Sequence, residues 1–212
     1  MMGAVEPDRR RVLLADAALV LVLVEVVLAG IGSLRSGLTQ DQLVNDGLVL
    51  SNAVLGASLA LGGYPIARWR PGHPVGWMLI AAGLGFATSA AGYATLAWLA
   101  APGSSALGWR LLADLTNLGW AVAVAFFLPM TLLLFPDAAL PSRRWRPLVG
   151  LAALNAVLLG SLAALPDQTL TVPLGVHGLL HWSAVGEAAW VPVASEVVGL
   201  AVFGGERAEE DA

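Results

Sequence analysis

The chain has 212 residues, of which 58% are hydrophobic and 12% are charged, and its mean hydropathy is +0.76. A soluble domain carries about 45 to 50% apolar and about 25% charged residues, so this balance indicates an integral membrane protein. The chain lacks cysteine, which excludes disulfides, thiolate metal sites and cysteine nucleophiles, and its net charge of −4 argues against a nucleic-acid partner.

Polar residues divide the apolar sequence into segments close to the ~20 residues that a membrane-spanning helix requires. A polar leader, residues 1–11, precedes the first segment, and an acidic tail, residues 205–212, follows the last one. We therefore expect an all-α fold, a polytopic bundle of six transmembrane helices. The predicted spans cover residues 12–32, 47–66, 75–100, 111–135, 148–165 and 182–204.

Four of these segments contain residues that test the assignment. A cleaved signal peptide is the alternative for the first, but its apolar run exceeds the ~7 to 15 residues of a signal peptide. In the second, Gly62–Gly63 ahead of Pro65 predicts the end of the helix. In the fourth, Pro129 removes a backbone hydrogen bond and predicts a kink. The sixth is the weakest prediction, because Glu187 and Glu196 interrupt it.

The arginines predict how the chain is threaded through the membrane, since Lys and Arg in short loops mark the cytoplasmic side. With the N-terminus in the cytoplasm and six spans, only Arg35 and Arg110 fall outside. Both termini are therefore predicted to be cytoplasmic, in a bacterial inner membrane. Without the sixth span the C-terminus would lie outside, and the bias would survive. The arginines on the cytoplasmic side are Arg9, Arg10, Arg11, Arg68, Arg70, Arg143, Arg144, Arg146 and Arg207.

Small residues in the third span predict close helix packing. Ala81, Gly85 and Ser89 lie on one stripe, with Thr88 and Gly92 on an adjoining one, and small residues let helix backbones approach in lipid. We expect this helix to be central. The alternative is that alanine and glycine are simply abundant in this chain.

Four polar residues form a candidate ligand-binding layer, because an acid in the hydrocarbon costs about 2.5 to 3.5 kcal/mol on insertion scales. Glu25 and Asn52 enter the first two spans at a similar depth, so they would meet if those helices pack. Asn117 and Glu187 fall in the same outer layer. The hypothesis is a polar pocket for a small ligand or protons. The alternative is that these groups only hydrogen-bond one helix to another.

Other polar residues give weaker signals. Asp16 is predicted to be an interface residue, and Arg110 and Asp114, four apart, predict a surface ion pair. His177 and His181 are also four apart, but a third metal ligand is missing from the local pattern, so no metal site is expected. A phosphate loop, a Ser/His/Asp arrangement and a cofactor box are all missing from the sequence. We therefore expect neither catalysis nor a cofactor.

Two stretches carry a family resemblance: residues 70–77, RPGHPVGW, and residues 133–147, LLFPDAALPSRRWRP. They resemble the RPxNPVGW-like turn and the FPDGxLPSxRWRP-like loop in the N-terminal multi-helix membrane region of actinobacterial sensor histidine kinases. Residues 172–175, VPLG, are similar to the NPLG turn before the last helix of that region. The resemblance covers about residues 65–205, and its motifs are loops rather than catalytic signatures.

The chain also departs from that family. His73 stands where the family usually has Asn, and Ala138 where it has Gly, substitutions expected to affect the two turns. The family continues into a dimerisation helix with a phospho-accepting histidine and then an ATP-binding domain. Here no histidine follows His181, so we expect an input module without the kinase core.

The resemblance implies a sensory input module, non-enzymatic alone, that signals through a separate kinase or regulator in the cytoplasm. A second copy of the chain is a further candidate partner. The alternatives are a small transporter or channel subunit, which would need a polar path through both leaflets, and a purely structural membrane protein. The arginines expected to face the partner are Arg68, Arg70, Arg143, Arg144 and Arg146.

Overall fold

The computed structural model describes residues 9–140, 142–165, 171, 174–181, 193–194 and 196–198. These residues form helices and connecting loops and contain no strand. Five helical segments in the described residues are long and apolar enough to cross a membrane, which confirms the prediction of an all-α membrane protein. Most of the predicted sixth span, with Glu187 in it, lies outside the described residues. The five segments are Arg9–Arg35, Val49–Trp69, Pro74–Leu99, Leu107–Leu134 and Arg143–Ala164.

The helix ends lie close to the predicted ones, with one correction. The second helix does not end at Gly62–Gly63 but continues through Pro65 to Trp69. A proline inside a membrane helix is tolerated because the freed backbone groups can be satisfied locally. Arg68, expected in a loop, therefore lies in the last helical turn. The elements are α1 Arg9–Arg35, η1 Gln42–Asp46, α2 Val49–Trp69, α3 Pro74–Leu99, α4 Leu107–Val122, η2 Ala123–Phe127, α5 Leu128–Leu134, η3 Arg143–Trp145 and α6 Arg146–Ala164.

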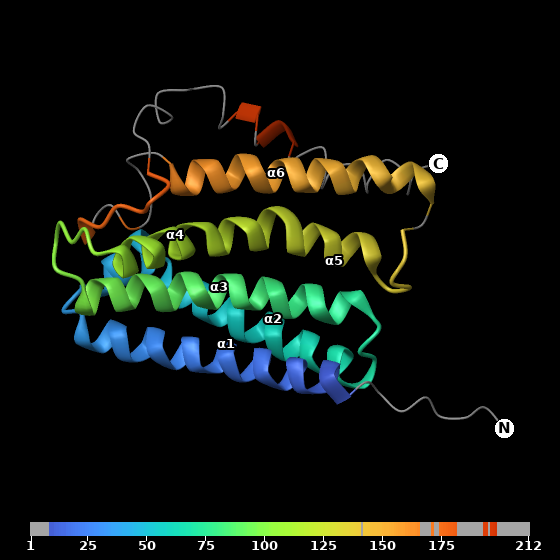
Figure 1. The fold of residues 1–212 in the computed structure, drawn as a ribbon, viewed down its shortest axis with the longest axis horizontal. Helices are drawn as coiled ribbons and strands as arrows, with labels where there is room; N and C mark the ends of the chain where they lie inside the picture. Colours follow the sequence, from blue (N-terminus) through green and yellow to red (C-terminus); the bar gives the residue numbers. More distant parts are fainter. Residues whose placement is uncertain are drawn as a thin grey trace.

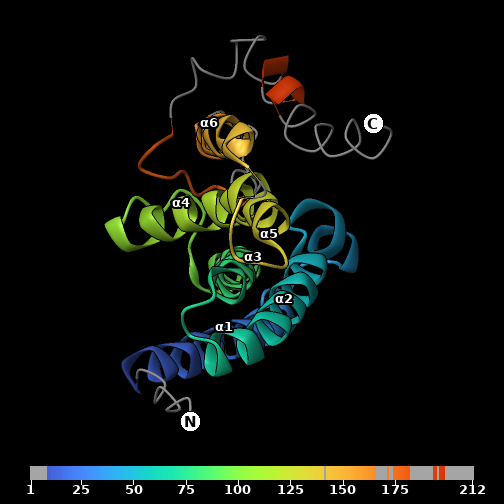
Figure 2. The same ribbon diagram turned by 90° about the vertical axis from the view of Figure 1, so that its right-hand side faces the viewer.

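The long helices lie side by side and alternate in direction (Figure 1). Seen along their axes, α3 occupies the centre, with α1 and α2 on one side, α4 and α5 on the other and α6 beyond them (Figure 2). Buried clusters join these layers: Ala87 of α3 packs with Val22 of α1 and Ala60 of α2, and Phe86 packs with Ala123 of η2. The prediction that the third span is central is confirmed.

Glycines set the distance between α3 and its neighbours. A side-chain carbon added at Gly83 would lie 2.7 Å from the carbonyl oxygen of Gly56 in α2, and one added at Gly76 would lie 2.6 Å from the Ala67 nitrogen. On the other face, a carbon at Gly85 would lie 2.5 Å from the Gly119 oxygen of α4. Backbone therefore meets backbone at these crossings, which favours helix association in lipid.

The fourth span changes its hydrogen-bonding pattern before Pro129. The π-helical turn η2 separates α4 from α5, and the Leu128 N–H donates to the Ala123 carbonyl, five residues back. Proline cannot donate to the carbonyl four residues before it, and such interruptions and π-turns go together in bent helices. A π-turn therefore precedes Pro129, and the kink predicted at this proline stays a prediction.

The loops gather at the two ends of the bundle. We call the end formed by residues 9–11, the turn 70–73 and the loop 135–145 the arginine-rich end. The opposite end carries the connections 36–48 and 100–106 and the segment 174–181, together with Arg35 and Arg110. Among the described residues, the arginines at or near the arginine-rich end are Arg9, Arg10, Arg11, Arg68, Arg70, Arg143, Arg144 and Arg146.

The glycine crossings predict that Gly83→Ala lowers the free energy of unfolding by about 1 to 3 kcal/mol, because the added methyl group overlaps the α2 backbone. The matched control is Gly62→Ala in α2, where an added carbon meets no atom within 4 Å and where the stability should change by at most ~1 kcal/mol. Unfolding in bicelles by steric trapping measures both. Equal effects of the two substitutions would contradict the proposed role of the crossings.

Candidate functional site

The structure does not join Glu25 to Asn52. Glu25 of α1 accepts a hydrogen bond from the Thr88 hydroxyl of α3 at 2.9 Å, while its second carboxyl oxygen, Oε2, is buried without a partner among the described residues. Asn52 of α2 is 4% exposed, and its Nδ2 likewise finds no partner there. Glu25 therefore contacts α3, and Glu25 and Asn52 each keep one buried polar atom without a hydrogen-bond partner among the described residues. A ligand bound by them stays a hypothesis.

Asn117 lies elsewhere, on the face of α4 that contacts Thr171 and the segment 174–181. It is 1% exposed, and its Nδ2 donates to the Thr171 hydroxyl at 3.2 Å. One turn earlier, the Asp114 carboxylate accepts the backbone N–H groups of Leu179 at 2.8 Å and Leu180 at 3.3 Å. Asn117 and Asp114 thus fasten a connecting segment to α4. Glu187, the fourth residue of the predicted layer, lies outside the described residues.

Arg110 and Asp114 do not form the predicted surface ion pair. The Arg110 guanidinium instead donates to the Gly178 carbonyl at 3.1 Å, beside the two N–H groups that Asp114 binds. Gly178 packs so closely on the Asp114 carboxylate that a side chain there would overlap it. The two charged side chains of α4 therefore bind backbone groups of opposite polarity in one segment: Arg110 binds a carbonyl and Asp114 binds N–H groups. The spacing of four residues does not reveal this.

The two histidines at the opposite end lie on a non-helical segment, so the helical spacing argument does not apply to them. The rings of His177 and His181 are 4.5 Å apart between centroids and tilted by 45°. Among the described residues, no third side chain completes a group that would hold a metal. The two rings contact each other within the segment 174–181.

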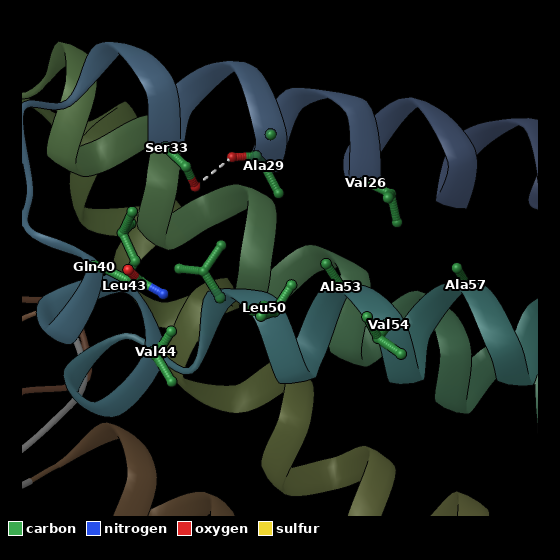
Figure 3. Close-up of a pocket in the computed structure, with 12 residues that line it drawn as sticks. Val26, Ala29, Ser33, Gln40, Leu43, Val44, Leu50, Ala53, Val54 and Ala57 are labelled. Carbon is green, nitrogen blue, oxygen red and sulfur yellow. Dashed lines mark hydrogen bonds between the residues drawn. The ribbon is translucent and has the colours of Figure 1, made fainter.

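A cavity of about 490 Å³ opens between α1, η1 and α2 (Figure 3). Ser33 and Gln40 lie at its η1 end, and Val26 and Ala57 lie at the end nearer the middle of the bundle. The Ser33 hydroxyl already donates to the Ala29 carbonyl at 2.7 Å. None of the four residues of the predicted layer lines this cavity, which is apolar over nearly all of its wall.

At the arginine-rich end, Asp16 connects α1 to α2. Its carboxylate accepts from the Arg68 guanidinium in an ion pair and from the Tyr64 hydroxyl at 2.9 Å. Both charged side chains are a little over one-third exposed, so water screens their attraction and the pair chiefly fixes how α1 and α2 are oriented. Asp16 was predicted to lie at the membrane–water interface. In the structure it joins α1 to α2.

The two stretches with the family resemblance meet at this end. The His73 ring, between α2 and α3, donates from Nε2 to the Pro136 carbonyl of the α5–α6 loop at 3.0 Å. In the same turn, the Pro71 carbonyl accepts from Trp77 at 3.0 Å and from Arg11 at 3.3 Å. One turn thus connects the start of α1, the start of α3 and the loop after α5.

Ala138, expected to affect its turn, adopts a backbone conformation that favours glycine. Its φ is 62°, in the left-handed region, and its N–H donates to the Leu134 carbonyl at 2.8 Å. A residue with a side chain costs roughly 1 kcal/mol there. Ala138 therefore strains the turn that it occupies. His73, in the other turn, supplies a ring N–H that reaches the α5–α6 loop.

Several of these contacts were missed in the sequence. Thr88 was predicted only as a small packing residue and Tyr64 was not singled out, because which face of a helix meets its neighbour depends on packing. The asparagine and aspartate of α4 did stand out as polar groups in an apolar span, but their partners lie more than fifty residues away along the chain. No family model, curated protein or solved structure matches the chain. The geometry therefore carries the functional proposal.

The anchoring of the segment 174–181 predicts that Asp114→Ala accelerates amide hydrogen exchange at Leu179 and Leu180 by tenfold or more. Two charge-assisted hydrogen bonds are lost, and about 1.4 kcal/mol of lost protection corresponds to tenfold. The measurement is exchange followed by mass spectrometry of the peptide that contains both residues. Asp41→Ala is the control, because among the described residues the Asp41 carboxylate binds only the nearby Asn45 side chain. Unchanged exchange in Asp114→Ala would rule out the anchoring role.

Proposed function

We propose that this chain is a membrane-embedded sensory input module, non-enzymatic on its own, that passes a change of helix packing to a cytoplasmic partner. The observation that carries the proposal is the network at the arginine-rich end. There His73, Pro71 and Asp16 connect elements from α1 to the α5–α6 loop. A shift of one helix would therefore move the turns and loops of the whole arginine-rich end.

Unpaired charge on the same face supports a partner. Asp16 neutralises Arg68, but the guanidinium groups of the remaining loop arginines have no hydrogen bond or ion pair among the described residues. Unpaired guanidinium groups favour an acidic surface with carboxylates that can accept two parallel hydrogen bonds. The groups in question belong to Arg70, Arg143, Arg144 and Arg146.

The same residues support the proposed orientation, with the arginine-rich end in the cytoplasm of a bacterial cell. A transporter or channel, the rival function, would need polar groups along its whole path. In the described residues, the clusters that join the helices in the middle of the bundle consist of apolar side chains such as Val22, Phe86 and Ala123. The sensory proposal requires no such continuous path.

The orientation predicts opposite labelling of two single cysteines, which the chain allows because it has none of its own. Ser104→Cys, in the α3–α4 connection, should react with a membrane-impermeant maleimide in intact cells. Ser142→Cys, ahead of η3, should react only after the cells are opened. Each variant is its own control when labelled before and after lysis. The reverse pattern would place the arginine-rich end outside and refute the proposed orientation.

The partner hypothesis predicts that crosslinking and affinity capture from native membranes recover a separate histidine kinase or response regulator. Replacing Arg143, Arg144 and Arg146 by alanine should lower that recovery about tenfold, since each charge contact contributes a fraction of a kcal/mol to a few kcal/mol. The measurement is quantitative mass spectrometry.

Arg35→Ala, at the other end of α1, is the control and should leave the recovery unchanged. Two results would count against the proposal. One is recovery of this chain alone in stoichiometric oligomers. The other is flux of ions or small solutes through the purified protein in vesicles, which would favour the transporter.

A further inference from the structure

The cavity between α1 and α2 arises where the two helices separate at the opposite end of the bundle. The connection between them forms the π-helical turn η1 and then places Leu48 at a φ of 50°, in the left-handed region. A π-turn is rare and frequently marks a functional site, and a left-handed leucine carries strain. Gly47 of the same connection lies against the Tyr93 ring of α3. This contact fixes η1 at the edge of the cavity, where Leu43 and Val44 form part of the wall.

The cavity opens toward the lipid. Leu50 and Val54 of α2 line it and are 60% and 56% exposed, so they face the hydrocarbon and form one edge. Gly30 of α1 also lines it and is exposed, and a side-chain carbon added there would meet no atom within 4 Å. Small side chains, those of Ala29, Ala53 and Ala57, line much of the rest. An apolar chain could therefore enter sideways from the membrane.

At the η1 end the apolar cavity continues into a polar one. The second cavity, of about 350 Å³, is lined by Gln40, Asp41, Val44 and Asn45, and Gln40 and Val44 line both. The Gln40 amide makes no hydrogen bond within the described residues, whereas Asp41 and Asn45 bind each other. A free amide, with two donors and one acceptor, thus lies at the junction of the apolar and polar spaces.

We propose that this groove binds one acyl chain of a membrane phospholipid, with the ester group at Gln40 and the headgroup in the polar cavity. The volume of about 490 Å³ lies in the range of ligand pockets, roughly 300 to 1,000 Å³. The apolar space adjoins the hydrocarbon and the polar space adjoins the loop end, which is the polarity of a lipid standing in its own leaflet. A soluble ligand would match only the second cavity.

The lipid site does not depend on the proposed signalling partner. It lies at the end opposite the arginine-rich face, and its lining includes none of the residues assigned there. It can be tested on the purified protein alone. A failure of one proposal therefore leaves the other standing.

The test uses a phosphatidylcholine with a photoreactive diazirine on one acyl chain. The probe is added to vesicles of phosphatidylethanolamine and phosphatidylglycerol that contain the full chain. After illumination, mass spectrometry maps the labelled residues. We expect labels concentrated on residues 26–57, well above those on lipid-facing positions elsewhere, such as Val157 of α6.

Gly30→Leu should lower the labelling of the groove about tenfold, because the added side chain occupies space that several methylene groups would fill. Gly62→Leu is the matched control, an exposed helical glycine with equal room outside the cavity, and should label like the wild type. Gln40→Leu should lower labelling while leaving the fold intact.

Three results would overturn the proposal. The first is equal labelling of the groove and of Val157, which would indicate bulk lipid contact only. The second is unchanged labelling in a folded Gly30→Leu variant. The third is a crosslink between two copies of the chain at the groove. If Gly30→Leu does not fold, the wild-type map and Gln40→Leu still decide the question.

Discussion

Close approach of α3 to its neighbours is the constraint on which the rest of the structure depends. In lipid, apolar side chains gain little by leaving the membrane for another helix, so association relies on tight packing. Gly76 and Gly83 bring α2 against one face of α3, and Gly85 brings α4 against the other. With α2 and α4 fixed, their ends are fixed too. The contacts of the loops at both ends follow from that spacing.

α1 also approaches the α3 backbone at a glycine, since a side-chain carbon at Gly32 would lie 2.8 Å from the Ala94 carbonyl oxygen, and it makes polar contacts besides. It contacts α2 through Asp16 and Arg68 at the arginine-rich end, and it contacts α3 through Glu25 and Thr88 further along. Beyond Glu25 it diverges from α2, because η1 requires room beside the two helices. The polar bonds and the apolar groove are therefore two parts of one arrangement: where α1 and α2 stop touching, a lipid-accessible space begins.

The sequence predicted the five described helices well, because about twenty apolar residues between polar stretches have few other solutions in a membrane. It failed at Pro65, where a soluble-protein rule for helix ends was applied to a membrane helix. The candidate site was less predictable. Glu25 and Asn117 stood out by chemistry, but their partners depend on helix rotation and on a segment that folds back over α4. The crossing from His73 to Pro136 joins residues 63 positions apart, and no local pattern encodes it.

The narrow buried stripe of α1 has a consequence for how the protein is inserted into the membrane during synthesis. Its buried apolar residues Ala15, Val22 and Ala29 recur every seven positions, so a single narrow stripe of the helix is covered. Of the five spanning segments, α1 is the most apolar and the least buried, while α3 is much less apolar and the most buried. The first helix can therefore leave the translocon and remain stable in lipid alone. The third, with its glycine surface, can gain stability from packing against α1 and α2, which are synthesised before it, and then from α4, which follows it.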